Sequence, residues 1–169
     1  MVCAFTWAMH ERSDVLRAFL LSFMLLGVLF PTSVMATEEG RATETWSGVV
    51  TLSEDHTVSF QNELIIQGCT DIQMSSGVRI YVEGKLTIQG TNACPVTLNS
   101  NGIGSDHEGI QFNASSRQSQ STISFLEISN SVYGITIYDS DPQISNLTII
   151  NPDNVGIDLF DGADPTLSD

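Results

Sequence analysis

A short pattern that recurs about every 22 residues constrains this chain more than any other sequence feature, because repeats of this size are typical of stacked architectures. The segment LIIQG at 64–68 returns as LTIQG at 86–90, and ISFLEISN at 123–130 returns as ISNLTIIN at 144–151. Apolar and polar residues alternate within these segments, which is the period of a strand rather than of a helix. Such short units bury their apolar side only by stacking on one another, so the pattern predicts an all-β solenoid.

Two rival architectures fit the pattern less well. A sandwich or barrel would show longer strands joined by two-residue turns. A leucine-rich repeat needs L-x-x-L-x-L-x-x-N; Ile144, Leu147 and Ile149 occupy its apolar positions, but Asn151 comes one place early and no helical return segment follows. We therefore predict a right-handed parallel β-helix over residues 46–169, with about five to six coils and three short strands per coil.

One coil is expected to contain strands at 123–129, at 134–138 and near 142–144. Inward side chains of successive coils should stack about 4.8 Å apart, so that Ile lies on Ile. Asn130 and Asn151 follow equivalent strands. We expect both to point inward and to form a ladder of side-chain hydrogen bonds that satisfies buried backbone groups.

The two ends of the chain differ from the repeats. Residues 1–36 combine a polar lead, an apolar run at 18–30 and small residues up to Ala36, which predicts a secretory signal cleaved after that residue. A retained membrane anchor is the alternative, although the apolar run is shorter than the ~20 residues of a spanning helix. Residues 37–45 predict a flexible leader. The repeat is still running at Asp169, so we expect an uncapped, incomplete C-terminal end.

The charge balance narrows the set of partners. Six Lys and Arg stand against 20 Asp and Glu, giving a net charge of −14. Such a surface repels nucleic acid and anionic membranes, so we expect neither as a partner, and no membrane contact beyond the signal segment. The predicted signal indicates a secreted or cell-surface protein, and an acidic surface also suits solubility, divalent cations or a salty exterior.

Two cysteines remain after the predicted signal is removed. Cys69 and Cys94 form an even pair in a chain directed to an oxidising compartment. Their separation in the sequence is slightly more than one repeat. A bridge between neighbouring coils and two separate buried thiols both fit this spacing, because a bridge needs Cα atoms within about 7 Å.

Three segments carry a further resemblance: residues 134–151, residues 155–167, and residues 82–91 with 95–98 after them. They resemble the parallel β-helix repeats of the pectin-lyase-like superfamily. The resemblance implies a right-handed β-helix of the kind found in secreted microbial proteins. That superfamily includes pectate lyases, polygalacturonases, alginate epimerases and adhesins, so the fold does not determine the activity.

The catalytic motifs of the related enzymes are missing. Alginate epimerases carry Asp-Pro-His, whereas the Asp-Pro pairs at 141–142 and 164–165 are followed by Gln143 and Thr166. The signature motifs of polygalacturonases are absent as well. Pectate lyases need an Arg or Lys among calcium-binding acids, and we expect neither Lys85 nor Arg117 to lie in the acidic cluster. The resemblance thus supplies no catalytic residue that can be named.

The best candidate for a cation site is a set of four acidic residues, Asp139, Asp141, Asp161 and Asp164. The second pair follows the first by about one repeat, so these carboxylates should lie on neighbouring coils. Close carboxylates repel one another unless a hard cation such as Ca²⁺ lies between them. The alternative is ordinary turn chemistry, since Asp before Pro or Gly is common in turns. Ca²⁺ is therefore a candidate cofactor, and no other is indicated.

A few other polar residues qualify as minor candidates. His56 and His107 lie in predicted loops without a nucleophile beside them, and we expect both to be solvated. Asn113 and Asn146 begin N-x-S/T sequons and are candidate glycosylation sites.

Two functions follow from these observations. The first is a secreted or cell-surface β-helix module with a structural, adhesive or carbohydrate-binding role, whose partner is a polysaccharide or cell-surface glycan. The second is the N-terminal part of a lyase, hydrolase or uronate epimerase that acts on acidic glycans. The absent catalytic motifs favour the first.

Overall fold

The computed structural model describes residues 40–102 and 106–169. The predicted signal, residues 1–36, and the first residues of the predicted leader lie outside these ranges. The first strand starts at Thr43, so residues 43–45 of the predicted leader belong to the fold.

The described residues form short strands and one 3₁₀ helix, without an α-helix. The elements are β1 (Thr43–Trp46), β2 (Val49–Leu52), β3 (His56–Val58), β4 (Glu63–Gln67), β5 (Asp71–Met74), β6 (Arg79–Val82), β7 (Lys85–Gln89), β8 (Val96–Ser100), β9 (Gly109–Phe112), η1 (Ala114–Ser119), β10 (Thr122–Ser129), β11 (Tyr133–Tyr138), β12 (Gln143–Ile150), β13 (Val155–Phe160) and β14 (Thr166–Ser168).

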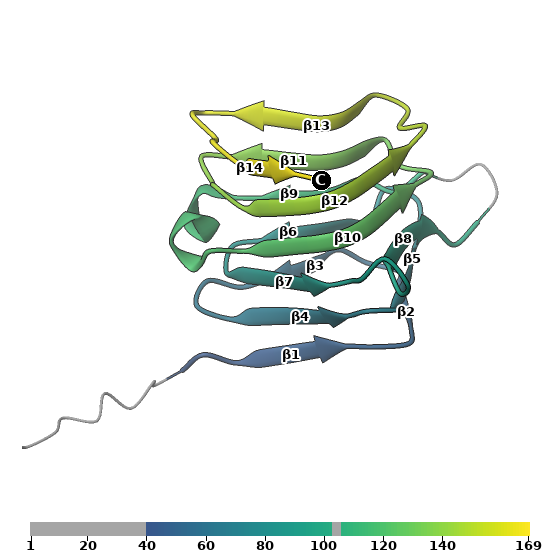
Figure 1. The fold of residues 1–169 in the computed structure, drawn as a ribbon, viewed down its shortest axis with the longest axis horizontal. Coiled ribbons are helices and arrows are strands. Elements are labelled where there is room, and N and C mark those ends of the chain that lie inside the picture. The colour runs from purple at the N-terminus through teal and green to yellow at the C-terminus, as the bar shows by residue number, and fades with distance from the viewer. Residues whose placement is uncertain (1–39, 103–105) are drawn as a thin grey trace, which may run out of the picture. The chain divides into compact units, whose positions relative to one another are not determined.

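These strands confirm the predicted all-β parallel solenoid, with about six coils of roughly 22 residues. Each strand pairs in parallel with its equivalent on the next coil, and Figure 1 shows the coils stacked on one another. Ile66, Ile88, Ile123 and Ile144 are paired in register and are at most 2 % exposed. They form the predicted isoleucine ladder.

The number of strands per coil differs from the prediction after the third coil. The first three coils have three strands each, but β10 pairs with β7 through residues 122–124 and with β8 through residues 126–128. Phe125 lies between these stretches at a φ of 49°, so the strand turns the corner without ending. Asn146 does the same in β12 at a φ of 51°. The fourth and fifth coils therefore each consist of an eight-residue bent strand and a six-residue strand, and β14 is the one strand that the described residues supply to the last coil.

The third coil is longer than the others. Ile88 follows Ile66 by one ordinary repeat, and Ile144 follows Ile123 in the same way. Between Ile88 and Ile123 the chain is much longer, yet these two residues still pair directly. Some of the additional residues form η1, which lies outside the ladder. The core register is the same on both sides of the insertion, because Ile88 and Ile123 occupy paired inward positions.

The asparagine ladder was predicted in the wrong orientation. Asn130 and Asn151 do occupy equivalent corners, but both are exposed rather than inward. Their φ values are 55° and 46°, a left-handed conformation that Asn adopts more easily than most residues. The Asn130 amide donates to Oδ1 of Asn99, 2.6 Å away on the preceding coil. These asparagines turn the chain instead of filling the core.

Substitution of Gly109 tests how tightly the coils are stacked. Gly109 and Gly77 share a φ of +73°, but a Cβ at Gly109 would collide with the carbonyl oxygens of Tyr133 and Gly134, whereas one at Gly77 would meet nothing within 4 Å. We expect Gly77→Ala to cost about 1 kcal/mol for the left-handed conformation alone. Gly109→Ala should cost about 2 kcal/mol more, because the next coil must move. Urea unfolding of both variants measures this, and equal losses would contradict the stacking.

Candidate functional site

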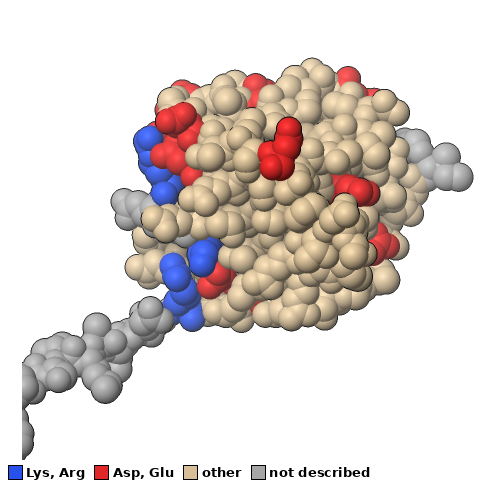
Figure 2. All heavy atoms as spheres, viewed as in Figure 1, with Lys and Arg blue, Asp and Glu red and all other residues tan. Residues whose placement is uncertain are grey.

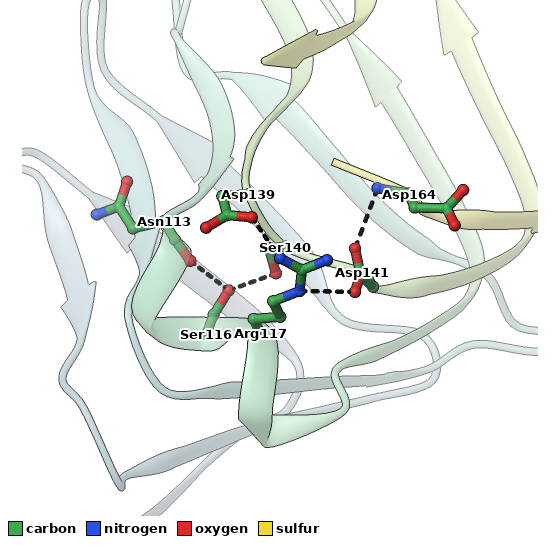
Figure 3. Close-up of polar contacts among 7 residues, drawn as sticks. All are labelled: Asn113, Ser116, Arg117, Asp139, Ser140, Asp141 and Asp164. Carbon is green, nitrogen blue, oxygen red and sulfur yellow. Dashed lines mark hydrogen bonds and ion pairs between the residues drawn. The ribbon is translucent and has the colours of Figure 1, made fainter. Parts of the chain in front are cut away.

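The corner that carries Asp139 and Asp141 also contains an arginine, which the sequence did not lead us to expect there. The guanidinium of Arg117 forms an ion pair with Asp139 through Nη1, and its Nε donates to Oδ2 of Asp141 at 2.9 Å (Figure 3). The expectation that no base joins this cluster is therefore wrong. The reason is the insertion in the third coil, which folds as η1 and brings Arg117 alongside the corner between β11 and β12.

Local hydrogen bonds position η1 over this corner. The backbone N–H and the hydroxyl of Ser116 both donate to the carbonyl of Asn113, at 2.9 and 2.7 Å. The Ser116 hydroxyl also lies 2.8 Å from the hydroxyl of Ser140, and both serines are only 2 % exposed. This buried hydroxyl pair connects η1 to the residue between Asp139 and Asp141, so the arginine and its two carboxylates are held by the same contact.

The corner extends to the following coil through Asp164. Its backbone N–H donates to Oδ1 of Asp141 at 3.0 Å (Figure 3), while Oδ2 of the same carboxylate accepts from Arg117. One carboxylate thus connects residues 117, 141 and 164, which lie on three successive coils. We call the set formed by Arg117, Asp139, Asp141 and Asp164 the acidic corner.

The four predicted cation ligands are not gathered around one point. Within residues 40–102 and 106–169, no group of three or more His, Cys, Asp or Glu side chains is arranged to hold a metal ion. Asp139 and Asp141 face the guanidinium, Asp164 contributes its backbone N–H, and Asp161 is exposed at a φ of 55°. The sequence suggested that Ca²⁺ would provide the positive charge between these carboxylates. In the structure Arg117 provides it between Asp139 and Asp141.

The chemistry open to the acidic corner is limited. A guanidinium stays charged under ordinary conditions, so it cannot accept a proton as a general base. The Arg117 side chain is 45 % exposed, and its partners Asp139 and Asp141 are 41 % and 35 % exposed. Exposed ion pairs of this kind contribute little to stability singly. Arg117 bonds to two different carboxylates, so its main effect is to fix their position relative to η1. The arrangement is that of a clamp between coils.

His107 is buried, which contradicts the expectation of a solvated loop residue. It is 0 % exposed; its Nδ1 accepts the Gly109 N–H at 3.0 Å, and its Nε2 lies 3.1 Å from the carbonyl of Ser129. These partners fix the neutral tautomer with the proton on Nε2. Burial lowers the pKa of His107, and this outweighs the opposing effects of the Ser129 and Leu98 carbonyls and of the Glu108 charge.

His107 should make the fold sensitive to mild acid. The unfolded state takes up a proton as pH falls below about 6.5, whereas the lowered pKa keeps the folded imidazole neutral, so stability decreases as pH falls from there. The slope attributable to this residue should approach about 1.4 kcal/mol per pH unit. Urea unfolding between pH 7.5 and 5 measures it. His107→Gln should flatten this slope and His56→Gln should keep it; an unchanged slope in His107→Gln would contradict the prediction.

His56 belongs to a polar group in the first coil, and it too is not fully solvated. Its Nε2 lies 3.3 Å from Oε2 of Glu44, and its ring packs edge-on against Trp46. The other carboxylate oxygen of Glu44 accepts from the Trp46 indole N–H at 2.6 Å. Glu44 and Trp46 lie on β1 and His56 lies on β3, so these contacts connect two strands of the first coil. We interpret them as structural.

The two cysteines form a disulfide with a Cα–Cα distance of 4.7 Å. The chain makes a small turn at residues 91–94, where Thr91 and Cys94 pair as an antiparallel bridge. That turn absorbs the extra residues that made the separation of the cysteines differ from one coil. The Cys69 N–H also reaches the Cys94 carbonyl at 3.2 Å, so the bridge joins the second and third coils where their backbones already meet.

Both predicted glycosylation sites lie at corners. Asn113 precedes η1, and its side-chain oxygen accepts from the Gln111 amide at 2.9 Å. Asn146 occupies the bend of β12 and is half-buried. The structure gives their positions, and their modification stays a prediction.

Arg79 is a centre of contacts that sequence reasoning did not find. It is paired in register with Gly109, which has no side chain, and the guanidinium extends over the next coil. There it forms an ion pair with Glu108 at 2.6 Å and lies 5.9 and 5.6 Å from the ring centres of Tyr81 and Tyr133. Tyr81 is a neighbour on β6, whereas Glu108 and Tyr133 come close only through the pairing of β6 with β9 and of β9 with β11.

Positive charge on the described surface is largely neutralised locally. Three of the four Lys and Arg residues in the described ranges form ion pairs: Arg79 with Glu108, Lys85 with Glu63 at 2.9 Å, and Arg117 with the acidic corner. The Lys85 hydrogen bond lowers the pKa of Glu63. In Figure 2 the visible Lys and Arg atoms gather along one edge, next to acidic atoms, and most of that face is uncharged.

Comparison with known proteins does not supply a family. No protein-family model matches the chain, and no curated protein or solved structure is significantly similar to it. No helix in the described part of the chain is long and apolar enough to cross a membrane.

Proposed function

We propose that this chain is a non-catalytic module of a secreted or cell-surface protein that binds carbohydrate and serves as a rigid adhesive or structural element. The observation that carries the proposal is the acidic corner. Its arginine, both paired carboxylates and the Asp164 N–H bond to one another across three coils. The cluster that most resembles an active site in the sequence thus has its polar groups bonded to one another between successive coils.

The charge distribution favours neutral over acidic carbohydrate. A uronate polymer needs Arg or Lys side chains to pair with its carboxylates. Arg79, Lys85 and Arg117 already have carboxylate partners in the described structure, and the chain has a net charge of −14. Binding a polyanion would require breaking these pairs against an unfavourable overall field.

The proposed location rests on two features. The predicted signal at 1–36 directs export, and the Cys69–Cys94 disulfide fits an oxidising compartment. The candidate sequons at Asn113 and Asn146 fit the same destination. The resemblance to pectin-lyase-like repeats is consistent with a secreted glycan-related protein, and the parallel solenoid supports it at the level of the fold.

A second candidate function is the N-terminal part of a polysaccharide-active enzyme. The observation that favours it is the presence of Arg117 beside Asp139 and Asp141, a combination of a cation and two carboxylates that the sequence did not indicate. A lyase acting there would require Arg117 to leave both carboxylates, and Ca²⁺ would require the same. The first function needs neither rearrangement.

Assays on uronate polymers separate the two functions. Purified protein with polygalacturonate or alginate and Ca²⁺ should release no product and change no uronate configuration, because the acidic corner is a clamp. Affinity electrophoresis in gels containing soluble neutral glucans and mannans should show retardation.

The matched variants are Asp141→Asn, in the acidic corner, and Asp158→Asn, on the outer side of β13. Turnover of a uronate polymer that Asp141→Asn abolishes and Asp158→Asn keeps would contradict the non-catalytic role. Failure to bind any polysaccharide would contradict carbohydrate binding.

A further inference from the structure

The outer side of strands β1, β4, β7, β10, β12 and β14 forms a regular two-column face. The inward residues of these strands, such as Ile88 and Ile123, are buried, so their neighbours on either side point outward. The in-register pairs place the first column at Thr45, Ile65, Thr87, Thr122, Gln143 and Thr166. They place the second column at Gln67, Gln89, Ser124, Ser145 and Ser168. We call these two columns the flat face.

No side chain of the flat face is charged, although the chain carries 20 Asp and Glu. The nearest ion pair on these strands, Glu63 with Lys85, is two residues before the first column and borders the flat face. Figure 2 views the molecule from the side on which β1, β4, β7 and β10 face the reader, and that side is mostly uncharged. Neutral hydroxyls and amides shed bound water at a lower cost than charges do.

The flat face has the dimensions of an extended array. Neighbouring strands are about 4.8 Å apart, and outward residues on one strand are about 6.7 Å apart. Six strands therefore give a face about 24 Å long, from five spacings of about 4.8 Å. The strand spacing of about 4.8 Å repeats along the solenoid axis, so a ligand with a short repeat of its own can contact equivalent groups on successive coils.

Hydrogen bonds within the flat face hold some of its side chains in place. The hydroxyls of Ser124 and Ser145 lie 3.1 Å apart, and Ser145 donates to the carbonyl of Ile123 at 3.2 Å. The Thr87 hydroxyl donates to Glu63 at 3.0 Å. Side chains that are ordered before binding lose less entropy when a ligand arrives. The exposed residues Gln67 and Gln89 present their amides to solvent beside them.

We propose that the flat face binds the ordered surface of a neutral polysaccharide, in which extended chains lie side by side. This rests on the carbohydrate-binding function proposed above and names its site and ligand class. Sugar hydroxyls both donate and accept, as do the Thr, Ser and Gln groups of the flat face. A planar ligand suits a planar face, and a neutral ligand avoids the repulsion that the net charge imposes on uronates.

A binding experiment with insoluble glycans tests the site. The protein is mixed with microcrystalline cellulose, with chitin and with insoluble calcium polygalacturonate, and the bound fraction is measured by sedimentation. The double variant Gln67→Glu and Gln89→Glu places two charges on the flat face without changing side-chain size. Asn154→Asp and Asp158→Asn, located in the turn before β13 and on β13, serve as controls away from the face. Circular dichroism checks that every variant keeps its fold.

We expect binding to cellulose or chitin, a loss of at least tenfold in affinity in the double variant, and no change in the controls. Binding to polygalacturonate alone would overturn the neutral ligand but keep carbohydrate binding. Neutral binding that the double variant retains would overturn the site. Binding to none of the three glycans would overturn both proposals. They would be overturned equally if the flat face proved to have another role, such as slowing ice recrystallisation or forming a dimer that the double variant abolishes.

Discussion

The stacking of inward aliphatic side chains from one coil onto the next is the interaction on which this structure depends. Ile66, Ile88, Ile123 and Ile144 lie in one row, and Ile80, Ile110, Ile135 and Ile137 belong to another part of the same core. Fully burying such a side chain contributes about 1.5–3 kcal/mol. A single coil cannot bury its apolar side alone, so stability arises between neighbouring coils. A residue added within a strand of the ladder would turn the following side chains of that strand to the opposite face, whereas one added at a corner would not.

The same register determines the outer surface. Because inward residues repeat from coil to coil, outward residues also align, and side chains that are distant in sequence become neighbours. Arg79 meets Glu108 and Tyr133 for this reason, and Arg117 meets Asp139 and Asp141. The acidic corner and the flat face are two outcomes of one rule. The first uses paired charges to connect coils, and the second keeps charge away from a broad, repeating surface.

The sequence predicted those parts of the fold that depend on a local period. Alternation around Ile88 and Ile144 was sufficient to identify inward positions, and the recurrence gave the coil. It could not predict the path of the third coil, because the residues between Ile88 and Ile123 carry no repeat that shows where they fold back. The position of Arg117 and the burial of His107 both depend on that path. The orientation of Asn130 was wrong because Asn serves buried ladders and left-handed corners equally well, and only the backbone angle distinguishes them.

The direct test of this account is whether β7 and β10 are in contact. Nuclear Overhauser contacts can be recorded in solution on protein with isotope-labelled isoleucine methyl groups. The account predicts contacts between Ile88 and Ile123, across the whole insertion of the third coil, together with contacts between Ile123 and Ile144. Contacts of Ile123 with Ile144 but not with Ile88 would show that the insertion breaks the stack into two parts, and would contradict the continuous ladder.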